Sequence, residues 1–178
     1  KNEIAKLAHQ VELEVQGAAS PIDTTLSTHG GVIYLSNNAN KILKLDINTE
    51  IPIIIGYTSK RGNTGKLVDS VRIKVEKYPE IMNSILNSME SITNHACKAL
   101  INRDHQKIGE LMNINHGLLD SIGVSTEELS KMVYSARKAG ALGSKVTGAG
   151  GGGSIIAYLL IKVLSNARVI NLGKRVRE

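Results

Sequence analysis

Apolar residues between Thr64 and Gly140 recur every three or four positions, whereas those in residues 31–55 and 153–172 alternate or run together in short stretches. The first pattern predicts helices, over residues 64–77, 79–103, 105–122 and 126–139. The second predicts strands, over residues 31–35, 41–45, 51–55, 153–160 and 168–172, with the first two joined as a hairpin around 37–40. Seven residues separate the last two strands, which suits a hairpin but is too short for a parallel connection unless residues are missing. A helical block between groups of strands predicts an α+β fold.

The first thirty residues predict two more helices separated by small residues. Apolar spacing over residues 4–16 predicts a helix that stops at Gly17. The following Ala-Ala-Ser-Pro cannot continue it, and Asp23 offers N-cap chemistry for a short second helix. At the start of the last predicted helix, Ser125 and Glu128 have the spacing of a capping box.

The composition argues against several classes of function. The net charge of +6 would attract polyanions, but Lys and Arg are scattered singly, and the chain has no Trp or Phe to stack on single-stranded nucleic acid. The single Cys97 requires no oxidising compartment, so we expect a cytoplasmic protein. No apolar run approaches the ~20 residues that span a bilayer, and the five His residues lack the spacing of a zinc site. We therefore expect neither a nucleic-acid partner nor a membrane.

A glycine-rich run, residues 145–153, has the sequence Lys-Val-Thr-Gly-Ala-Gly-Gly-Gly-Gly. Such a run can form a nest of backbone amides around an anion or let two loops press together, and it can also be only a flexible turn. Its position between a predicted helix and an apolar strand favours a ligand or packing role, because pure flexibility there would cost entropy. It does not match the Walker A pattern, since no Gly-Lys-Ser/Thr ends it.

Two further segments place polar groups at predicted helix starts. Asp23 follows Glu12 across the small-residue turn, and a helix N-terminus can hold a carboxylate beside a phosphate site. From spacing alone, the commoner explanation is that Asp23 only caps its helix and that Glu12 is a solvated surface group. Residues 58–66, Thr-Ser-Lys-Arg-Gly-Asn-Thr-Gly-Lys, suit an anionic substrate, although they also fit an ordinary polar loop.

Together these segments resemble the mevalonate kinases of the GHMP kinase superfamily, especially the archaeal members. The resemblance rests on four stretches in family order, residues 8–23, 64–68, 112–125 and 145–153. It implies the two-domain GHMP kinase fold, with residues 1–48 ending the N-terminal domain and residues 49–178 forming a ferredoxin-like C-terminal domain with added helices. Because the chain opens without Met inside an amphipathic pattern, we expect it to be the C-terminal part of a longer protein.

The resemblance implies ATP-dependent phosphorylation of the 5-hydroxyl of mevalonate, with ATP and Mg²⁺ as cofactors. Asp23 matches the aspartate that orients or deprotonates the attacking hydroxyl, and Glu12 matches a Mg²⁺ ligand. Thr64 and Ser20 would bind the substrate. The residues expected to bind the nucleotide are Gly148, Ala149, Gly150 and Gly151. Kinases of this family are often homodimers, so a homodimer is also expected by analogy.

Departures from the family pattern leave alternatives open. The family's Pro-x-x-x-Gly-Leu-Gly-Ser-Ser phosphate loop and its N-terminal lysine are absent, so the chain alone is expected to turn over negligibly. Pro21 stands where many relatives have a glycine, and Ser154 stands where a cysteine is common in the family. Arg61 is offset by one position from the family arginine in the same loop. One alternative is another GHMP kinase, for phosphomevalonate or a sugar. Asp23 argues against a homoserine kinase, where that aspartate is typically missing. The other is a non-catalytic module that binds anions or nucleic acid through the net positive charge.

Overall fold

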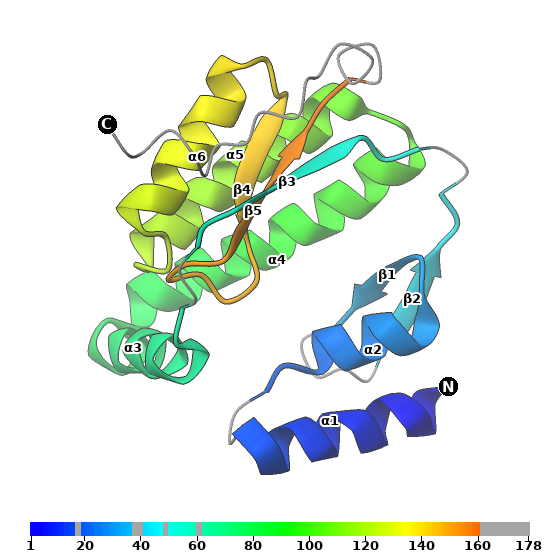
Figure 1. Ribbon diagram of the computed structural model, residues 1–178, viewed down its shortest axis with the longest axis vertical. Helices are drawn as coiled ribbons and strands as arrows, with labels where there is room; N and C mark the ends of the chain where they lie inside the picture. Colours follow the sequence, from blue (N-terminus) through cyan, green and yellow to red (C-terminus); the bar gives the residue numbers. More distant parts are fainter. Residues whose placement is uncertain (17–18, 37–40, 48–49, 60–61, 161–178) are drawn as a thin grey trace. The chain divides into compact units, whose positions relative to one another are not determined.

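The computed structural model describes residues 1–16, 19–36, 41–47, 50–59 and 62–160, which belong to two compact units, Lys1–Thr49 and Glu50–Glu178. Within these residues, the first unit contains two helices and a β-hairpin, and the second contains four helices and a three-stranded sheet (Figure 1). This mixture confirms the predicted α+β class. None of the helices in the described ranges is both long and apolar enough to cross a membrane.

The first unit follows the predicted pattern closely. Its elements are α1 (Asn2–Gln16), α2 (Pro21–His29), β1 (Val32–Leu35) and β2 (Ile42–Leu45). The two strands pair antiparallel, with Val32 opposite Leu45, and α1 packs against α2. The predicted first helix and both hairpin strands are thus confirmed to within two residues, while the hairpin tip at 37–40 lies outside the described residues.

The prediction that Asp23 caps α2 is wrong, because Ser20 takes that position. Ser20 has an extended backbone, and its Oγ accepts a hydrogen bond of 3.3 Å from the Ile22 amide. Pro21 follows in the first turn, where the missing N–H has no intrahelical acceptor and where a fixed φ suits the helix. Asp23 therefore lies in the first turn of α2 with a carboxylate that capping does not consume.

The predicted capping box of the last helix is also wrong by one residue. Thr126, rather than Ser125, is the N-cap, and its Oγ1 accepts a hydrogen bond of 3.3 Å from the Leu129 amide. The Ser125 hydroxyl instead forms a 2.9 Å hydrogen bond with the Ser130 hydroxyl. The helix start was predicted correctly, but the choice between adjacent hydroxyl residues was not.

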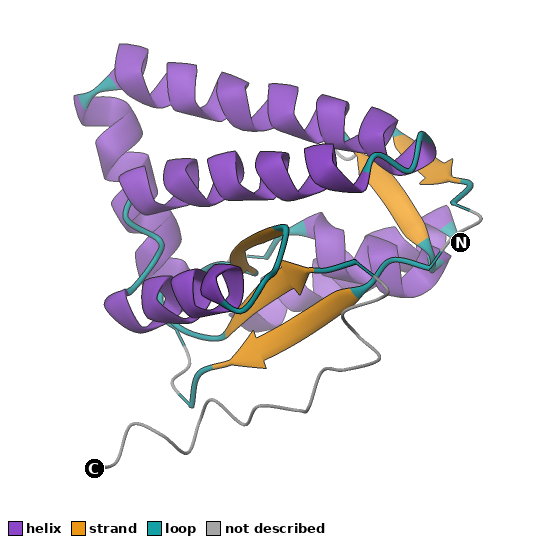
Figure 2. Cartoon of the chain, turned by 90° about the horizontal axis from the view of Figure 1, so that it is seen from above, coloured by secondary structure: helices purple, strands orange, loops and turns teal. Residues whose placement is uncertain are grey.

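The second unit combines a helical block with a small antiparallel sheet. Its elements are β3 (Ile53–Tyr57), α3 (Thr64–Lys77), α4 (Pro79–Ile101), α5 (His105–Ser121), α6 (Glu127–Lys138), β4 (Gly143–Thr147) and β5 (Ser154–Tyr158). The strands are ordered β3-β5-β4, and α4 and α5 lie side by side (Figures 1 and 2). All four predicted helices and the strands at β3 and β5 are confirmed to within two residues. The strand expected at 168–172, and its connection, lie outside the described residues.

Among the described residues, three apolar clusters form the core of the second unit, and two of them join helices to the sheet. Leu129 and Val133 of α6 pack against Val146 of β4 and Ile155 of β5, and all four side chains are fully or almost fully buried. A second cluster joins α4 to the α5–α6 connection, where Val124 is buried. These clusters fix both strands that flank the glycine-rich run, together with the α5–α6 connection that lies against it.

Strand β4 was not predicted, and close packing against α5 accounts for it. Its sequence, Gly-Ser-Lys-Val-Thr, begins with three residues that have little preference for strands. A Cβ atom added at Gly109 of α5 would lie 2.6 Å from the carbonyl carbon of Leu142, so helix and strand backbones approach too closely for a side chain. As a consequence, the glycine-rich run joins β4 to β5, and the prediction that it follows a helix is wrong.

Side chains of the neighbouring helices bind the edge of β4 that does not face β5. Asn113 of α5 accepts a 3.1 Å hydrogen bond from the Ser144 amide and donates one of 3.1 Å to the Leu142 carbonyl. Arg137 of α6 donates a 2.8 Å hydrogen bond to the Ser144 carbonyl. Because an unpaired strand edge is a template for pairing with other chains, these bonds protect β4 and fix its position along α5 and α6.

Asn113→Ala is expected to lower the free energy of unfolding by about 2 kcal/mol, because it leaves the Ser144 amide and the Leu142 carbonyl without this partner. Ser144, one of the residues that would lose a partner, is fully buried. Urea unfolding of the chain, followed by circular dichroism, measures the effect. Asn87→Ala, at an exposed position of α4, is the matched control and should leave the midpoint nearly unchanged. Equal midpoints for the two variants would show that the edge bonds do not stabilise β4.

Candidate functional site

The glycine-rich loop between β4 and β5 has a backbone conformation that requires its glycines. All five glycines from Gly148 to Gly153 have positive φ angles, between 69° and 144°. Residues with a Cβ atom rarely adopt these angles, so the composition of the loop has a conformational cause. The loop is a specific structure at one end of the sheet, as a ligand or packing role requires.

The four residues predicted to bind nucleotide divide into an exposed pair and a packed pair. Gly148 and Ala149 are exposed, and no atom lies within 4 Å of a Cβ added at Gly148. Gly150 is buried, and its added Cβ would collide with the Val124 carbonyl oxygen. The Gly151 amide already donates a 2.8 Å hydrogen bond to that same carbonyl. Gly148 and Ala149 are therefore the pair whose backbone a ligand can approach.

The segment after β3 packs directly against this loop. Thr58, which is 8% exposed, forms three hydrogen bonds with Gly153 through its amide and hydroxyl. A Cβ added at Gly62 would collide with the Gly150 carbonyl oxygen, so the two backbones are in close contact. The structure thus joins two motifs that were separate in the sequence. The intervening Lys60 and Arg61 lie outside the described residues.

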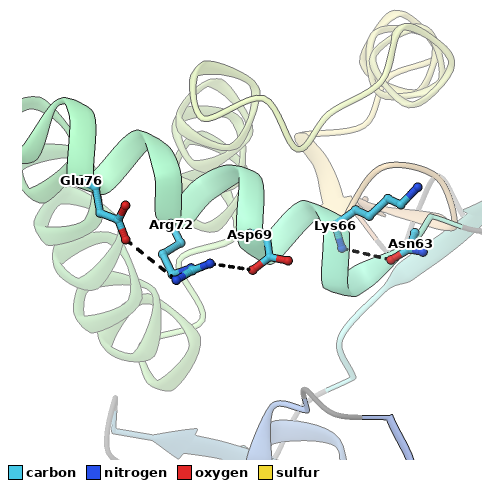
Figure 3. Close-up of polar contacts among 5 residues, drawn as sticks. All are labelled: Asn63, Lys66, Asp69, Arg72 and Glu76. Carbon is cyan, nitrogen blue, oxygen red and sulfur yellow. Dashed lines mark hydrogen bonds and ion pairs between the residues drawn. The ribbon is translucent and has the colours of Figure 1, made fainter.

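Thr64 opens helix α3 beside this contact. The N-cap Asn63 accepts a 3.0 Å hydrogen bond from the Lys66 amide (Figure 3), and both Thr64 and Lys66 are exposed. A hydroxyl, an ammonium and a helix N-terminus together favour an anionic group. Further along α3, Arg72 forms ion pairs with Asp69 and Glu76, but these exposed pairs contribute little to stability (Figure 3).

Two basic side chains of the second unit, Lys145 and His116, have pKa values that burial lowers. Lys145 precedes the loop by two residues, donates a 2.7 Å hydrogen bond to the Val146 carbonyl and has its pKa lowered by burial. His116 of α5 is 3% exposed; burial, and secondarily Arg137, lower its pKa, and Asp120 opposes this effect. The histidine spacing in the sequence gave no signal for this buried position. Burial therefore disfavours the charged form of both side chains, and His116 adds no positive charge near neutral pH.

The remaining predicted residues, Glu12, Ser20 and Asp23, all lie in the first unit. Glu12 is half-buried on α1, and Asp23 is exposed. Within the described residues, neither carboxylate has a hydrogen bond or ion pair, so both are available to a ligand. Ser20 uses its oxygen as the α2 cap but keeps a hydroxyl proton to donate.

The donor chemistry of the first unit fits Mg²⁺, although its described residues form no preformed cage. The described ranges contain no cluster of three or more His, Cys, Asp or Glu side chains. Mg²⁺ prefers oxygen ligands and is commonly held by one or two carboxylates together with substrate phosphates and waters. Glu12 of α1 and Asp23 of α2 supply ligands of this type.

Comparison with known proteins identifies the family. Residues 96–159 match the family described as GHMP kinases C terminal. The chain is 50% identical over 157 residues to a mevalonate kinase of Methanothermobacter thermautotrophicus, covering 88% of this chain and 51% of the relative.

Two solved structures extend the likeness to the fold. The L. major mevalonate kinase in complex with R-mevalonate has a TM-score of 0.83 at 29% identity, covering 93% of this chain and 51% of that one. The Methanococcus jannaschii mevalonate kinase has a TM-score of 0.72 at 31% identity, covering 93% of this chain and 50% of that one. The chain thus spans about half the length of the curated relatives it matches, and its residues 96–159 form a GHMP kinase C-terminal domain.

Proposed function

We propose that this chain takes part in the ATP-dependent phosphorylation of the 5-hydroxyl of mevalonate to give 5-phosphomevalonate, a reaction of isoprenoid biosynthesis. The observation that carries the proposal is 50% identity to a mevalonate kinase across 88% of the chain. The exposed glycine-loop pair, the anion-attracting start of α3 and the two unpartnered carboxylates are the groups that phosphoryl transfer needs.

In this proposal, each predicted site residue has a chemical role. Asp23 accepts or orients the proton of the mevalonate hydroxyl, and the backbone of Gly148 and Ala149 contacts the ATP phosphates. Thr64 and Ser20 bind the substrate through their hydroxyls. Mg²⁺, held in part by Glu12, would neutralise charge on the transferred phosphoryl group when bound.

Three further assignments belong to the same proposal. Gly150 and Gly151 support the nucleotide loop through their packing against the α5–α6 connection and α3. The protein acts in the cytoplasm on small molecules, and its active form is a homodimer. Since the chain spans about half of its relatives, the remaining ATP contacts come from residues outside this sequence.

The test is to fuse this chain to the half of the M. thermautotrophicus enzyme that it does not cover and to measure ATP consumption. We expect turnover that requires both mevalonate and Mg²⁺, and negligible turnover by the 178-residue chain alone. The intact relative is the positive control for the assay. A folded fusion that is inactive with mevalonate would contradict the proposal.

The same assay separates the alternatives. Activity with phosphomevalonate or galactose, but not with mevalonate, would retain a GHMP kinase and change its substrate. Steeply salt-dependent binding of nucleic acid, with no kinase activity, would instead indicate a non-catalytic module.

A further inference from the structure

The hydroxyl of Thr58 connects the end of β3 to the last residue of the glycine-rich loop. Its Oγ1 accepts a 3.0 Å hydrogen bond from the Gly153 amide and donates one of 3.1 Å to the Gly153 carbonyl. The Thr58 amide donates a further 2.8 Å bond to the same carbonyl. Thr58 follows β3 and Gly153 precedes β5, so these bonds continue the strand pairing that ends at Tyr57 and Ser154.

The side chain is needed here because the backbone cannot complete the pairing alone. Gly153 has a φ of 82°, which differs from the extended conformation of a strand, and its amide finds the Thr58 hydroxyl as its acceptor. Thr58 is 92% buried, so removing the hydroxyl would leave this amide without a partner in a site from which water is largely excluded.

A second set of contacts holds the loop from its other side. Gly62 meets the backbone of Gly150, and Leu67 of α3 packs where a Gly151 side chain would lie. The segment from Thr58 to Leu67 therefore contacts the loop at three residues. Thr64, one of the two residues proposed for substrate, lies between Gly62 and Leu67 in this segment, so it belongs to the same unit as the residues proposed for nucleotide.

From these contacts we infer that Thr58 is a positioning residue for the nucleotide loop: its hydroxyl fixes Gly153 and so places the exposed Gly148–Ala149 backbone for the ATP phosphates. The identity of the ligand, ATP, rests on the proposed kinase function. The contact between Thr58 and Gly153 does not depend on that proposal. Thr58 does not touch the substrate in this assignment; it acts through the loop, and this distinguishes it from Thr64.

Steady-state kinetics of the fusion test the inference. Thr58→Val, which replaces the hydroxyl by a methyl group of similar size, should raise the KM for ATP about tenfold, the scale of one lost hydrogen bond. The KM for mevalonate should change by less than about twofold, because residues 62–64 keep their own packing. Thr58→Ser keeps the hydroxyl and should restore the ATP KM. Thr93→Val, which removes an exposed α4 hydroxyl, is the matched control.

Amide hydrogen exchange of the 178-residue chain supplies a readout that needs no catalysis. In Thr58→Val the amides of Gly150 to Gly153 should exchange about tenfold faster, while those of α4 and α5 keep their wild-type rates. A global loss of stability would accelerate all of them together. If Thr58→Val does not fold, Thr58→Ala removes the same hydroxyl without introducing the extra methyl group.

The outcomes separate the two claims. A wild-type fusion without mevalonate-dependent turnover would contradict the proposed function, while hydrogen exchange would still test whether Thr58 holds the loop. An active fusion in which folded Thr58→Val keeps the wild-type ATP KM would overturn the positioning role. The positioning role would also be overturned if Thr58→Val raised the KM values for ATP and for mevalonate equally and Thr58→Ser did not restore them.

Discussion

Asp23→Asn in the active fusion is expected to lower kcat for mevalonate-dependent ATP consumption about 10³-fold, the middle of the range for loss of a positioned general base. Asparagine has nearly the same shape as aspartate but cannot accept the hydroxyl proton. Asp23 lies in the first turn of α2 and does not cap the helix. The measurement is kcat and KM for both substrates, and the loss should fall on kcat because the carboxylate acts in the transition state.

Structural damage is a weak alternative for this variant. Removing a negative charge from the first turn of a helix costs about 0.3–1 kcal/mol, and the Ser20 cap remains in place. Glu14→Gln removes an exposed carboxylate from α1 and should leave kcat nearly unchanged. Turnover by Asp23→Asn within a few-fold of the wild-type value would remove Asp23 from the reaction, whatever the family resemblance implies.

Local sequence signals were enough to predict most of the secondary structure. The helices of the second unit have strong apolar periodicity, and their ends coincide with Pro79, Asp104 and the residues around Gly123. Helix caps were less predictable, because two adjacent residues, such as Ser125 and Thr126, both offer a hydroxyl. The choice depends on backbone angles that a pattern of residue types does not determine.

Strand β4 shows why other parts needed the three-dimensional structure. Nothing in Gly143, Ser144 and Lys145 favours a strand. The hydrogen bonds that hold this segment come from Asn113, which is at least 29 residues away in the sequence, and from Arg137, which is seven residues away. The contact between Thr58 and Gly153 spans 95 residues in the same way. The sequence identified both motifs as candidate ligand-binding loops, but their joining depends on tertiary packing.

Gly109→Ala is expected to lower the free energy of unfolding by at least about 2 kcal/mol, although alanine favours a helix interior over glycine by about 1 kcal/mol. A Cβ at this position would lie 2.6 Å from the carbonyl carbon and oxygen of Leu142 and 2.7 Å from its Cβ. The obstacles are largely backbone atoms, so relief requires α5 and β4 to separate. Urea unfolding of the chain measures the change.

Gly117→Ala provides the control within the same helix and reverses the expected sign. Gly117 is exposed, and no atom lies within 4 Å of its added Cβ, so only the helix preference of alanine acts and stability should rise by about 1 kcal/mol. Because both variants add one methyl group to α5, their difference isolates the close contact with β4. If Gly109→Ala were instead as stabilising as Gly117→Ala, α5 would not lie against β4 as described, and the side-chain bonds along that edge would lose their geometric basis. The opposite signs would establish that helix packing, rather than strand preference, places the residues leading into the glycine-rich loop.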